Sequence, residues 1–495
     1  MDISNKLDRR DFLRILGLGS AALVMPSVCF SQNTGTKKLN VLFIAVDDLN
    51  DWIGCMGGNP QVKTPNIDRL VKLGATVMNK AYCPATVCCP SRTAIMTGLR
   101  PSTTGVYGNR NNPRNAPKAR SVVTLTEYFS KNGYHSLSRG KIFHKHMTET
   151  GLDEGQWAYD EWVPSPGATG IKRSELPLNG LMMIDGSKPT GQALAFDWGP
   201  SRNPKEQTKD YLTGQWAAQQ LKRKFDKPFF MAVGFSKPHL TWHVPQEFFD
   251  LYPLDEIELP VIKEDDLDDI KTQDGSAQHK PSQDYLRVKK YDKFKEAVQG
   301  YLAAISYVDT CIGLVLKALQ KSRYRDNTIV MIWGDHGWYL GEKLRYRKTK
   351  LWEESARVPF VIRVPGITRP NSKCNRVVNL IDIYPTLIDL CGLPKNLENE
   401  GRSFAPLLNN PGLPWEHPTL TTMGYSNHAV RDERYCYIRH SNGVQELYDH
   451  SLDPMEHFNL ASYPQYRPVI ERLANYLPTV DEPESPQNTI DRPKR

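Results

Sequence analysis

Three continuous apolar runs dominate the hydrophobic pattern of this chain. They cover residues 39–46, 228–234 and 328–333, and each is rich in β-branched or aromatic residues. Runs of this length without alternation are typical of strands buried on both faces of a parallel sheet. A polar cluster follows each run: Asp47-Asp48, Ser236-Lys237-Pro238-His239 and Asp335-His336. Because ligands bind at the carboxyl ends of parallel strands, we expect these clusters to form one active-site edge.

Helical periodicity appears between these runs. Residues 123–132 carry apolar side chains at helical spacing and end at Gly133, and residues 294–319 form a longer amphipathic stretch. The alternation of strand and helix indicates an α/β fold. The polar segment 255–291 lacks periodicity and predicts a surface excursion.

The pattern changes after about residue 410. Short strand-like pieces are separated by Asn and Gly and precede a helical stretch, at 419–422, 429–430, 435–438, 446–448 and 469–476. This pattern predicts a small C-terminal subdomain with an antiparallel sheet. We therefore place a catalytic domain at residues 38–410 and the C-terminal subdomain at 411–495.

The N-terminus has the features of an export signal. Arg9-Arg10 precede an apolar run at 15–25, followed by small or polar residues. A twin arginine before a short apolar run is typical of a Tat-type signal peptide, which we place at residues 1–31. The prediction is a bacterial protein that is exported to the periplasm or secreted. After the first thirty residues no uncharged apolar window of about 18 residues occurs, which predicts no membrane span.

Composition and charge narrow the function only slightly. The chain has 495 residues and a net charge of +8, with Lys and Arg spread along its whole length. This charge suits an anionic substrate, but its spread along the chain favours a generally solvated surface. No basic run is interleaved with aromatic residues, so nucleic-acid binding is not predicted.

The stretch Cys88-Cys89-Pro90-Ser91-Arg92 carries the most specific chemistry. It matches the Cys-x-Pro-x-Arg signal for oxidation of the first cysteine to formylglycine, whose hydrated aldehyde is a nucleophile that no encoded residue supplies. Ser91 is a candidate N-cap for a helix ending at Gly98, which would aim a helix N-terminus at an anion beside Cys88. Of nine cysteines, loss of Cys29 with the signal and conversion of Cys88 would leave seven. This odd number argues against a disulfide framework.

The polar clusters also predict a metal site. Asp47, Asp48, Asp335 and His336 form a mostly oxygen ligand set suited to one hard divalent cation. Calcium is the preferred ion because it is plentiful outside the cytoplasm. Manganese and magnesium remain open, and zinc in a phosphatase-like site is the alternative.

A second motif follows the first along the chain. It reads Gly133-Tyr134-His135-Ser136-Leu137-Ser138-Arg139-Gly140-Lys141-Ile142-Phe143-His144. Together with the clusters above and Glu446-Leu447-Tyr448-Asp449, it resembles the sulfatase family of the alkaline phosphatase superfamily from Asn40 to about Leu460. Within that family, Lys237-Pro238-His239 and Asp335-His336-Gly337-Trp338 are most similar to the iduronate-2-sulfatases. The resemblance implies a large mixed, mostly parallel sheet between helices.

The resemblance also implies residue roles. Cys88, as formylglycine hydrate, would attack sulfur and contact the metal, while Arg92 and Lys141 stabilise the sulfate oxygens. His239 and Lys348 would face the bridging oxygen, one of them protonating the leaving alcohol, and His144 would deprotonate the remaining hydroxyl to expel sulfate. Lys350 is a rival to Lys348, since a shift of two residues would substitute it.

The substrate remains the least determined feature. Candidate sugar contacts, which could equally be packing residues, are Asn109, Arg110, His243 and Trp338. We expect a sulfated oligo- or polysaccharide, with a 2-O-sulfated uronic acid as the preferred target, and a formylglycine-generating maturation enzyme as partner. The alternatives are a phosphodiesterase or phosphonate monoester hydrolase of the same superfamily, or a non-catalytic glycan-binding homologue.

Overall fold

The three apolar runs lie side by side at the centre of an eight-stranded sheet in the computed structural model, which describes residues 38–144, 159–164 and 175–486. The predicted signal peptide at 1–31 lies outside the described residues. In spatial order the strands are β12 (Ser372–Asn379), β2 (Thr76–Tyr82), β11 (Phe360–Arg363), β8 (Thr328–Gly334), β1 (Asn40–Val46), β6 (Phe229–Phe235), β3 (His135–Gly140) and β4 (Glu161–Val163).

The sheet is mixed but mostly parallel, as predicted. Strand β1 pairs in parallel with β6 and β8, so that Val46 lies opposite both Phe235 and Gly334. Only β11 runs antiparallel to its neighbours in this sheet. The carboxyl ends of the three central strands therefore meet at one edge.

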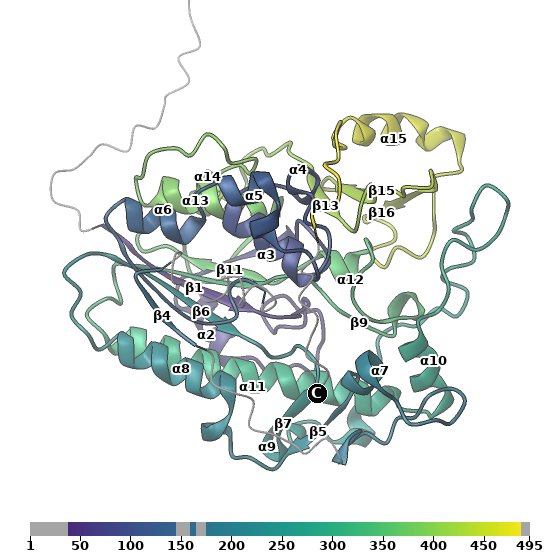
Figure 1. The fold of residues 1–495 in the computed structure, drawn as a ribbon, viewed down its shortest axis with the longest axis horizontal. Helices are drawn as coiled ribbons and strands as arrows, with labels where there is room; N and C mark the ends of the chain where they lie inside the picture. Colours follow the sequence, from purple (N-terminus) through teal and green to yellow (C-terminus); the bar gives the residue numbers. More distant parts are fainter. Residues whose placement is uncertain (1–37, 145–158, 165–174, 487–495) are drawn as a thin grey trace, which may run out of the picture. The chain divides into compact units, whose positions relative to one another are not determined.

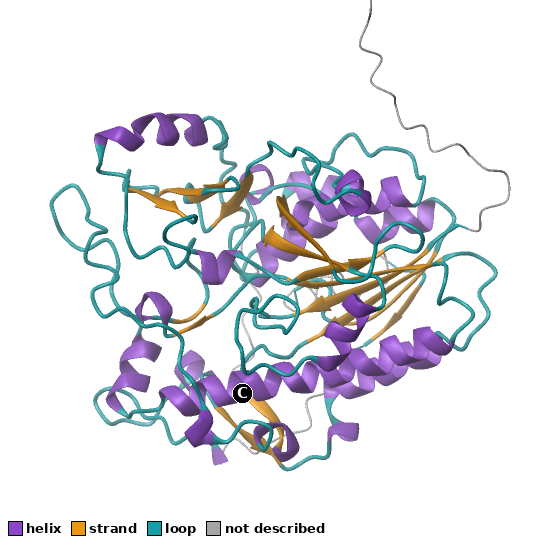
Figure 2. Cartoon of the chain, turned by 180° about the vertical axis from the view of Figure 1, so that it is seen from behind, coloured by secondary structure: helices purple, strands orange, loops and turns teal. Residues whose placement is uncertain are grey.

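Helices cover both faces of the sheet, as Figure 1 and the reverse view in Figure 2 show. One face is packed by α2 (Pro65–Lys72), α8 (Lys209–Gln220) and α11 (Phe294–Lys321). The other is packed by α3 (Cys88–Thr97), α6 (Leu125–Lys131), α13 (Ile383–Leu390) and α14 (Ala405–Asn409). Alternate residues of β1 enter the two cores, which explains why its apolar run is continuous.

Helix α11 is long and apolar enough to cross a membrane by length and composition alone, and no other helix of the described residues is. However, 72% of its most apolar window is buried inside the protein, where it packs against α8 and α2. Its apolar character is that of a core helix.

The predicted C-terminal antiparallel sheet is confirmed. Its four strands are β13 (Thr419–Thr422), β14 (His428–Arg431), β15 (Tyr435–Arg439) and β16 (Gln445–Asp449). Helix α15 (Arg467–Ala474) packs on them through Leu473, which lies in one apolar cluster with Val430, Tyr437 and Leu447. The side-chain amide of Asn379 donates to the carbonyl of Leu420, joining β12 to this sheet. The domain boundary at residue 410 stays a prediction.

The segment 255–291 differs from the expectation of an irregular excursion. It ends in α10 (Gln283–Lys290), because Tyr285 and Val288 find an apolar surface to pack against. The remaining helices and strands are short: α4 (Pro101–Thr104), α5 (Pro117–Ser121), α7 (Gly191–Ala195), β5 (Trp198–Ser201), β7 (Trp242–Pro245), α9 (Gln246–Phe249), β9 (Tyr339–Leu340), β10 (Tyr346–Arg347) and α12 (Glu353–Ala356). None of the described cysteines forms a disulfide.

Candidate active site

The polar clusters after β1, β6 and β8 meet at the edge where these strands end. The amide of Asp48 donates to Asp335 Oδ1 at 3.0 Å, and the amide of Asp335 donates to the carbonyl of Val46 at 3.3 Å. Asp48 has a φ of 60°, a left-handed conformation uncommon outside glycine and typical of functional sites. The sheet therefore brings the Asp47-Asp48 and Asp335-His336 clusters together, as the sequence predicted.

Helix α3 brings Cys88 to this edge. The helix begins at Cys88 itself with Val87 as N-cap, and it ends at Gly98, whose φ is 73°. Ser91 is therefore not the N-cap that the sequence suggested. It lies inside the first turn, and its hydroxyl donates to the carbonyl of Asp335 at 2.6 Å, which ties the helix to β8. The N-terminus of α3 thus lies beside the Asp47-Asp48 and Asp335-His336 clusters.

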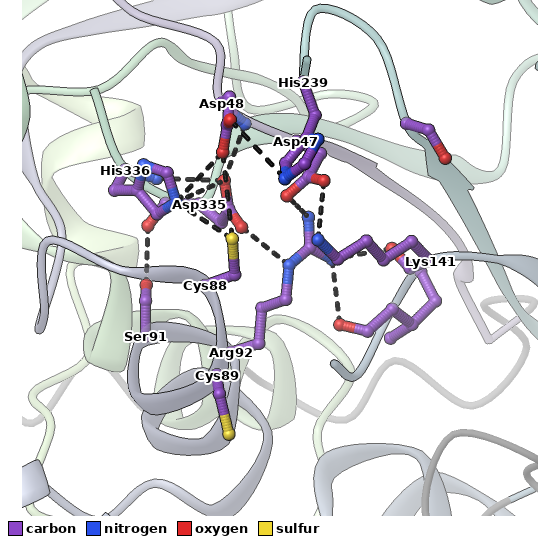
Figure 3. A network of polar contacts seen from close by, with 12 residues as sticks. Asp47, Asp48, Cys88, Cys89, Ser91, Arg92, Lys141, His239, Asp335 and His336 are labelled. Atoms are coloured by element: carbon purple, nitrogen blue, oxygen red, sulfur yellow. Dashed lines mark hydrogen bonds and ion pairs between the residues drawn. The ribbon is translucent and has the colours of Figure 1, made fainter. Parts of the chain in front are cut away.

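Four of the predicted metal ligands converge. Asp47, Asp48, Cys88 and His336 each offer an atom within 4.8 Å of the others, and all four are buried (Figure 3). The His336 Nε2 atom lies 3.2 Å from both Cys88 Sγ and Asp48 Oδ1. The fifth predicted ligand, Asp335, lies beside this group, but its carboxylate already accepts from Arg92 and from the amides of Asp48 and His336.

This ligand group fits a cation. The ammonium of Lys348 lies within it, 2.5 Å from Asp48 Oδ1, 3.1 Å from Cys88 Sγ and 3.3 Å from His336 Nε2. Asp48 Oδ2 is buried and accepts no hydrogen bond. A buried carboxylate oxygen without a donor, in a group that already surrounds one positive charge, is the arrangement that a hard divalent ion would complete.

Arg92 and Lys141 neutralise the other side of the cluster. Arg92 donates from Nε to Asp335 at 2.7 Å and from Nη2 to Asp47 at 3.3 Å, and Nη1 donates to the carbonyl oxygens of Lys141 and Ile142. The Lys141 ammonium lies 2.6 Å from Asp47 Oδ2. These fixed cations surround the space next to Cys88, where an anionic group would be stabilised.

The electrostatics of the site lower the pKa of Asp47 and raise the pKa of the Cys88 thiol. Burial alone would raise the pKa of Asp47, but Lys141, His239 and Arg92 together hold that pKa well below its usual value. Burial raises the pKa of the Cys88 thiol to about 12, although Lys141 and Lys348 oppose this shift. At neutral pH the encoded cysteine is therefore a weak nucleophile, since thiolate is the reactive form.

The other predicted catalytic residues are placed differently. His239 Nε2 lies 3.8 Å from Asp48 Oδ2, and its side chain is 40% exposed at the mouth of the cluster. The carbonyl oxygens of His239 and Thr241 accept from the ammonium of Lys237, which holds the turn that presents His239. The sequence placed Lys237 in the polar cluster after β6 but did not assign it this supporting contact. His144 is buried three residues beyond Lys141, at the end of the described stretch.

The structure also separates Lys348 from its rival. Lys350 points away from the cluster and lies 3.0 Å from His279 Nδ1. Lys348 contacts the cluster directly, as described above. Of the two lysines, Lys348 therefore lies in the cluster and Lys350 lies against His279.

The four candidate sugar contacts do not form one surface. Asn109 accepts from the amide of Cys89 at 2.9 Å and so secures the first turn of α3, while Arg110 is exposed. His243 is held by Asp197 at 2.9 Å and Thr241 at 2.8 Å. Trp338 is 1% exposed, with its ring in the core beside Tyr301, so it presents almost no face to a sugar.

Comparison with known proteins gives the site its context. The family model described as "Sulfatase" matches residues 39–393, and the one described as "N-sulphoglucosamine sulphohydrolase, C-terminal" matches residues 334–482. A protein named "Sulfatase" from Formosa agariphila is 37% identical over 449 residues, which cover 89% of this chain and 86% of that protein. "Iduronate 2-sulfatase" from Homo sapiens is 30% identical over 431 residues, covering 76% of this chain and 74% of that protein.

Solved structures share the fold. The structure of a 2-O GAG sulfatase aligns with a TM-score of 0.67 at 23% identity, covering 89% of this chain and 91% of that one. The matched family model spans most of the described catalytic sheet and includes every residue of the cluster at the strand ends. This chain therefore belongs to the sulfatase family, whose members are sulfuric ester hydrolases.

Proposed function

We propose that the protein is an exported sulfatase that hydrolyses sulfate esters of a sulfated glycan, with Cys88 converted to formylglycine as the source of its nucleophile. One observation carries the proposal. Cys88 lies at the N-terminus of α3 among carboxylates, an imidazole and two ammonium groups, yet burial keeps its thiol protonated. A site that gathers so many charged groups around residue 88, whose thiol pKa is raised by burial, favours oxidation of that residue to an aldehyde hydrate.

Each surrounding side chain has a task in this reaction. Arg92 and Lys141 balance the charge of the sulfate oxygens, and their own contacts with Asp47 and Asp335 hold them in place before substrate binds. His239, partly exposed at the mouth, and Lys348 are the groups placed to deliver a proton to the departing alcohol oxygen. Buried His144 is the candidate for the proton removal that expels sulfate.

A single calcium ion completes this proposal. Asp47, Asp48 and His336 would hold it together with residue 88, and Asp335 would support them from behind through its contacts with the Asp48 amide and Arg92. Such an ion supplies positive charge that stabilises the nucleophile and the sulfate oxygens. Lys348, which now lies among these ligands, would then be available to the substrate.

The preferred substrate is a 2-O-sulfated uronic acid. This preference is supported by the relative named "Iduronate 2-sulfatase" and by the cluster from Lys237 to His239. Export is supported by Arg9-Arg10 and the apolar run after them. If export uses these arginines, replacing both by Lys should retain the protein in the cytoplasm, as measured by cell fractionation.

The decisive experiment combines mass spectrometry with activity. After expression with a formylglycine-generating enzyme, the peptide containing Cys88 should lose about 18 Da relative to cysteine. The protein should release sulfate from a 2-O-sulfated uronic-acid oligosaccharide, and Cys88→Ala should abolish that release.

The matched control is Cys89→Ala, because Figure 3 shows the Cys89 sulfur pointing away from the cluster. That variant should remain active. An unmodified Cys88 in the presence of a competent maturation enzyme would contradict the mechanism. Hydrolysis of phosphate diesters or phosphonate monoesters in preference to sulfate esters would instead establish the phosphohydrolase alternative. Tight glycan binding without turnover would establish the binding alternative.

A further inference from the structure

The segment that carries Lys348 has an unusual backbone. Between residues 343 and 350, four residues other than glycine have a left-handed φ: Lys343 (51°), Leu344 (52°), Arg347 (74°) and Thr349 (74°). Side chains disfavour this conformation, and it persists only where surrounding contacts impose it. The contacts that impose it here determine where the intervening Lys348 points.

Those contacts come from the excursion at residues 255–291. The amide of Ser282 donates to the carbonyl of Leu344 at 3.0 Å, and the Ser282 hydroxyl accepts from the amide of Tyr346 at 3.3 Å. Asp266 lies 3.0 Å from the ammonium of Lys343. The excursion therefore contacts the segment at Lys343, Leu344 and Tyr346.

The contact next to Lys348 is an ion pair. Arg347 Nε donates to Asp284 Oδ2 at 2.5 Å, and Arg347 Nη2 donates to the carbonyl of Gln192 at 2.8 Å. On the other side of Lys348, the amide of Thr349 donates to the carbonyl of Thr86 at 3.2 Å, two residues before Cys88. Lys348 is thus held between two anchored neighbours, and its side chain turns the opposite way from that of Arg347, into the cluster.

Asp284 is itself held rigidly. Its second oxygen accepts from Arg287 at 3.0 Å, and the buried guanidinium of Arg287 also donates to three carbonyl oxygens, those of Leu181, Met182 and Ala193. Arg287 is 1% exposed. One carboxylate therefore links a fixed guanidinium on one side to the segment carrying Lys348 on the other.

We propose that Asp284 is a positioning residue for the sulfatase reaction: through Arg347 it holds the segment 343–350 in its left-handed conformation and thereby directs Lys348 toward residue 88. This inference rests on the proposed function. Asp284 has no contact with the catalytic cluster among the interactions of the described residues, and it acts only through Arg347, the residue before Lys348.

The first test is Asp284→Asn. The amide keeps the size of the side chain and is tolerated in the first turn of α10, but it removes the charge that holds Arg347. We expect kcat to fall roughly 10- to 100-fold with KM within about twofold, since misplacement of a group that acts on the departing oxygen affects the transition state. Asp284→Glu should recover part of the loss. The control is Glu264→Gln, which removes an exposed ion pair with Lys289 on the same excursion and should leave kcat unchanged.

A second pair of variants separates backbone strain from loss of charge. Arg347→Ala and Arg347→Gly both remove the ion pair, but glycine adopts a φ of 74° without steric cost. If the ion pair serves to hold the backbone, Arg347→Gly should retain severalfold more kcat than Arg347→Ala. Adding Asp284→Asn to Arg347→Ala should have no further effect on kcat. Equal activities of the two Arg347 variants would contradict the proposal.

A third measurement does not depend on activity. The Lys348 side chain is only 11% exposed, so an amine-acylating reagent followed by peptide mass spectrometry should modify it slowly in the wild-type protein. Asp284→Asn should raise that rate several-fold and leave Lys350 unchanged. An unchanged rate at Lys348, or an unchanged kcat in an active enzyme, would overturn the positioning role. Absence of sulfate release by the wild type would refute the proposed function, and the labelling result would still test whether Asp284 positions Lys348.

Discussion

Two buried carboxylates in this protein are surrounded by similar side chains, but only one of them has hydrogen-bond partners for both of its oxygens. Asp48, at the end of β1, has one oxygen without a hydrogen-bond donor, and its other oxygen shares the ammonium of Lys348 with Cys88 and His336. Both carboxylate oxygens of Glu446, on β16, have hydrogen-bond partners. His440 lies 2.5 Å from one of them, and Trp352 and Tyr448 donate to the other at 2.7 and 2.5 Å.

The difference distinguishes a binding site from a structural joint. We call Glu446, His279, His440, Trp352 and Tyr448 the Glu446 cluster. It joins the C-terminal sheet, through Trp352, to the chain just after Lys348, and both oxygens of Glu446 already have hydrogen-bond partners. In the Asp48 group, Asp48 Oδ2 has no hydrogen-bond donor, and a buried acceptor without a donor is expected where an ion or substrate completes the site.

The largest expected effect comes from Asp48→Asn. Loss of a charged ligand from the open group should reduce sulfate release by about 10⁴-fold, which corresponds to about 5.5 kcal/mol of transition-state stabilisation. Initial rates with enzyme whose residue 88 is fully converted would measure this. Glu446→Gln is the counterpart in the closed cluster and should keep kcat within about threefold. Similar losses in both variants would remove the distinction between the two clusters.

The next effect is on stability, where we expect the Glu446 cluster to matter more than the Asp48 group. Glu446→Ala should lower the free energy of unfolding by about 3–5 kcal/mol, because it leaves buried donors without their acceptor. Urea unfolding followed by tryptophan fluorescence would measure the change. Phe458→Ala, at a side chain 61% exposed on the same part of the chain, is a control that should change stability little. A loss below about 1 kcal/mol for Glu446→Ala would contradict the structural role of the cluster.

Acid should weaken the Glu446 cluster. Burial lowers the pKa of His279 to about 4, even though Glu446 opposes the shift, while Lys350 and His440 act with burial. Between the unfolded value near 6.5 and about 4, the unfolded chain binds a proton at His279 that the folded protein does not. Stability should therefore fall by about 3 kcal/mol as the pH decreases through this window. His279→Gln should flatten that part of a stability profile measured in urea, and an unchanged slope would show that other groups cause the loss.

The smallest effect concerns the proposed calcium ion. Chelation should lower the free energy of unfolding by about 2.7 kcal/mol if the free ion was present at 100 times its dissociation constant. The same treatment of Asp48→Asn should have little effect, whereas Glu446→Gln should respond like the wild type. Thermal unfolding with and without excess chelator would measure this. Equal stabilisation of the Asp48 variant by calcium would place the ion elsewhere.

Sequence reasoning succeeded where the signal is local. The continuous apolar runs predicted β1, β6 and β8 because a strand buried on both faces has no polar positions, and the residues after each run were identifiable as site candidates. Cys88 and Arg92 were found because the motif around them is contiguous. The short alternating pieces after residue 410 predicted the C-terminal sheet for the same reason.

Contacts between distant segments decided the rest. The sequence favoured Lys348 over Lys350, but only the structure places Lys348 in the cluster, through a left-handed backbone that contacts the excursion more than sixty residues away. Nor could it show that Trp338 lies in the core or that Ser91 bonds to Asp335, just after β8, instead of capping a helix. The sequence by itself determined which strands lie at the centre of the sheet and which polar residues follow them, since local hydrophobicity and motifs encode both. Only the tertiary structure decided which way those side chains face, because orientation follows from long-range packing and hydrogen bonds that no local pattern records.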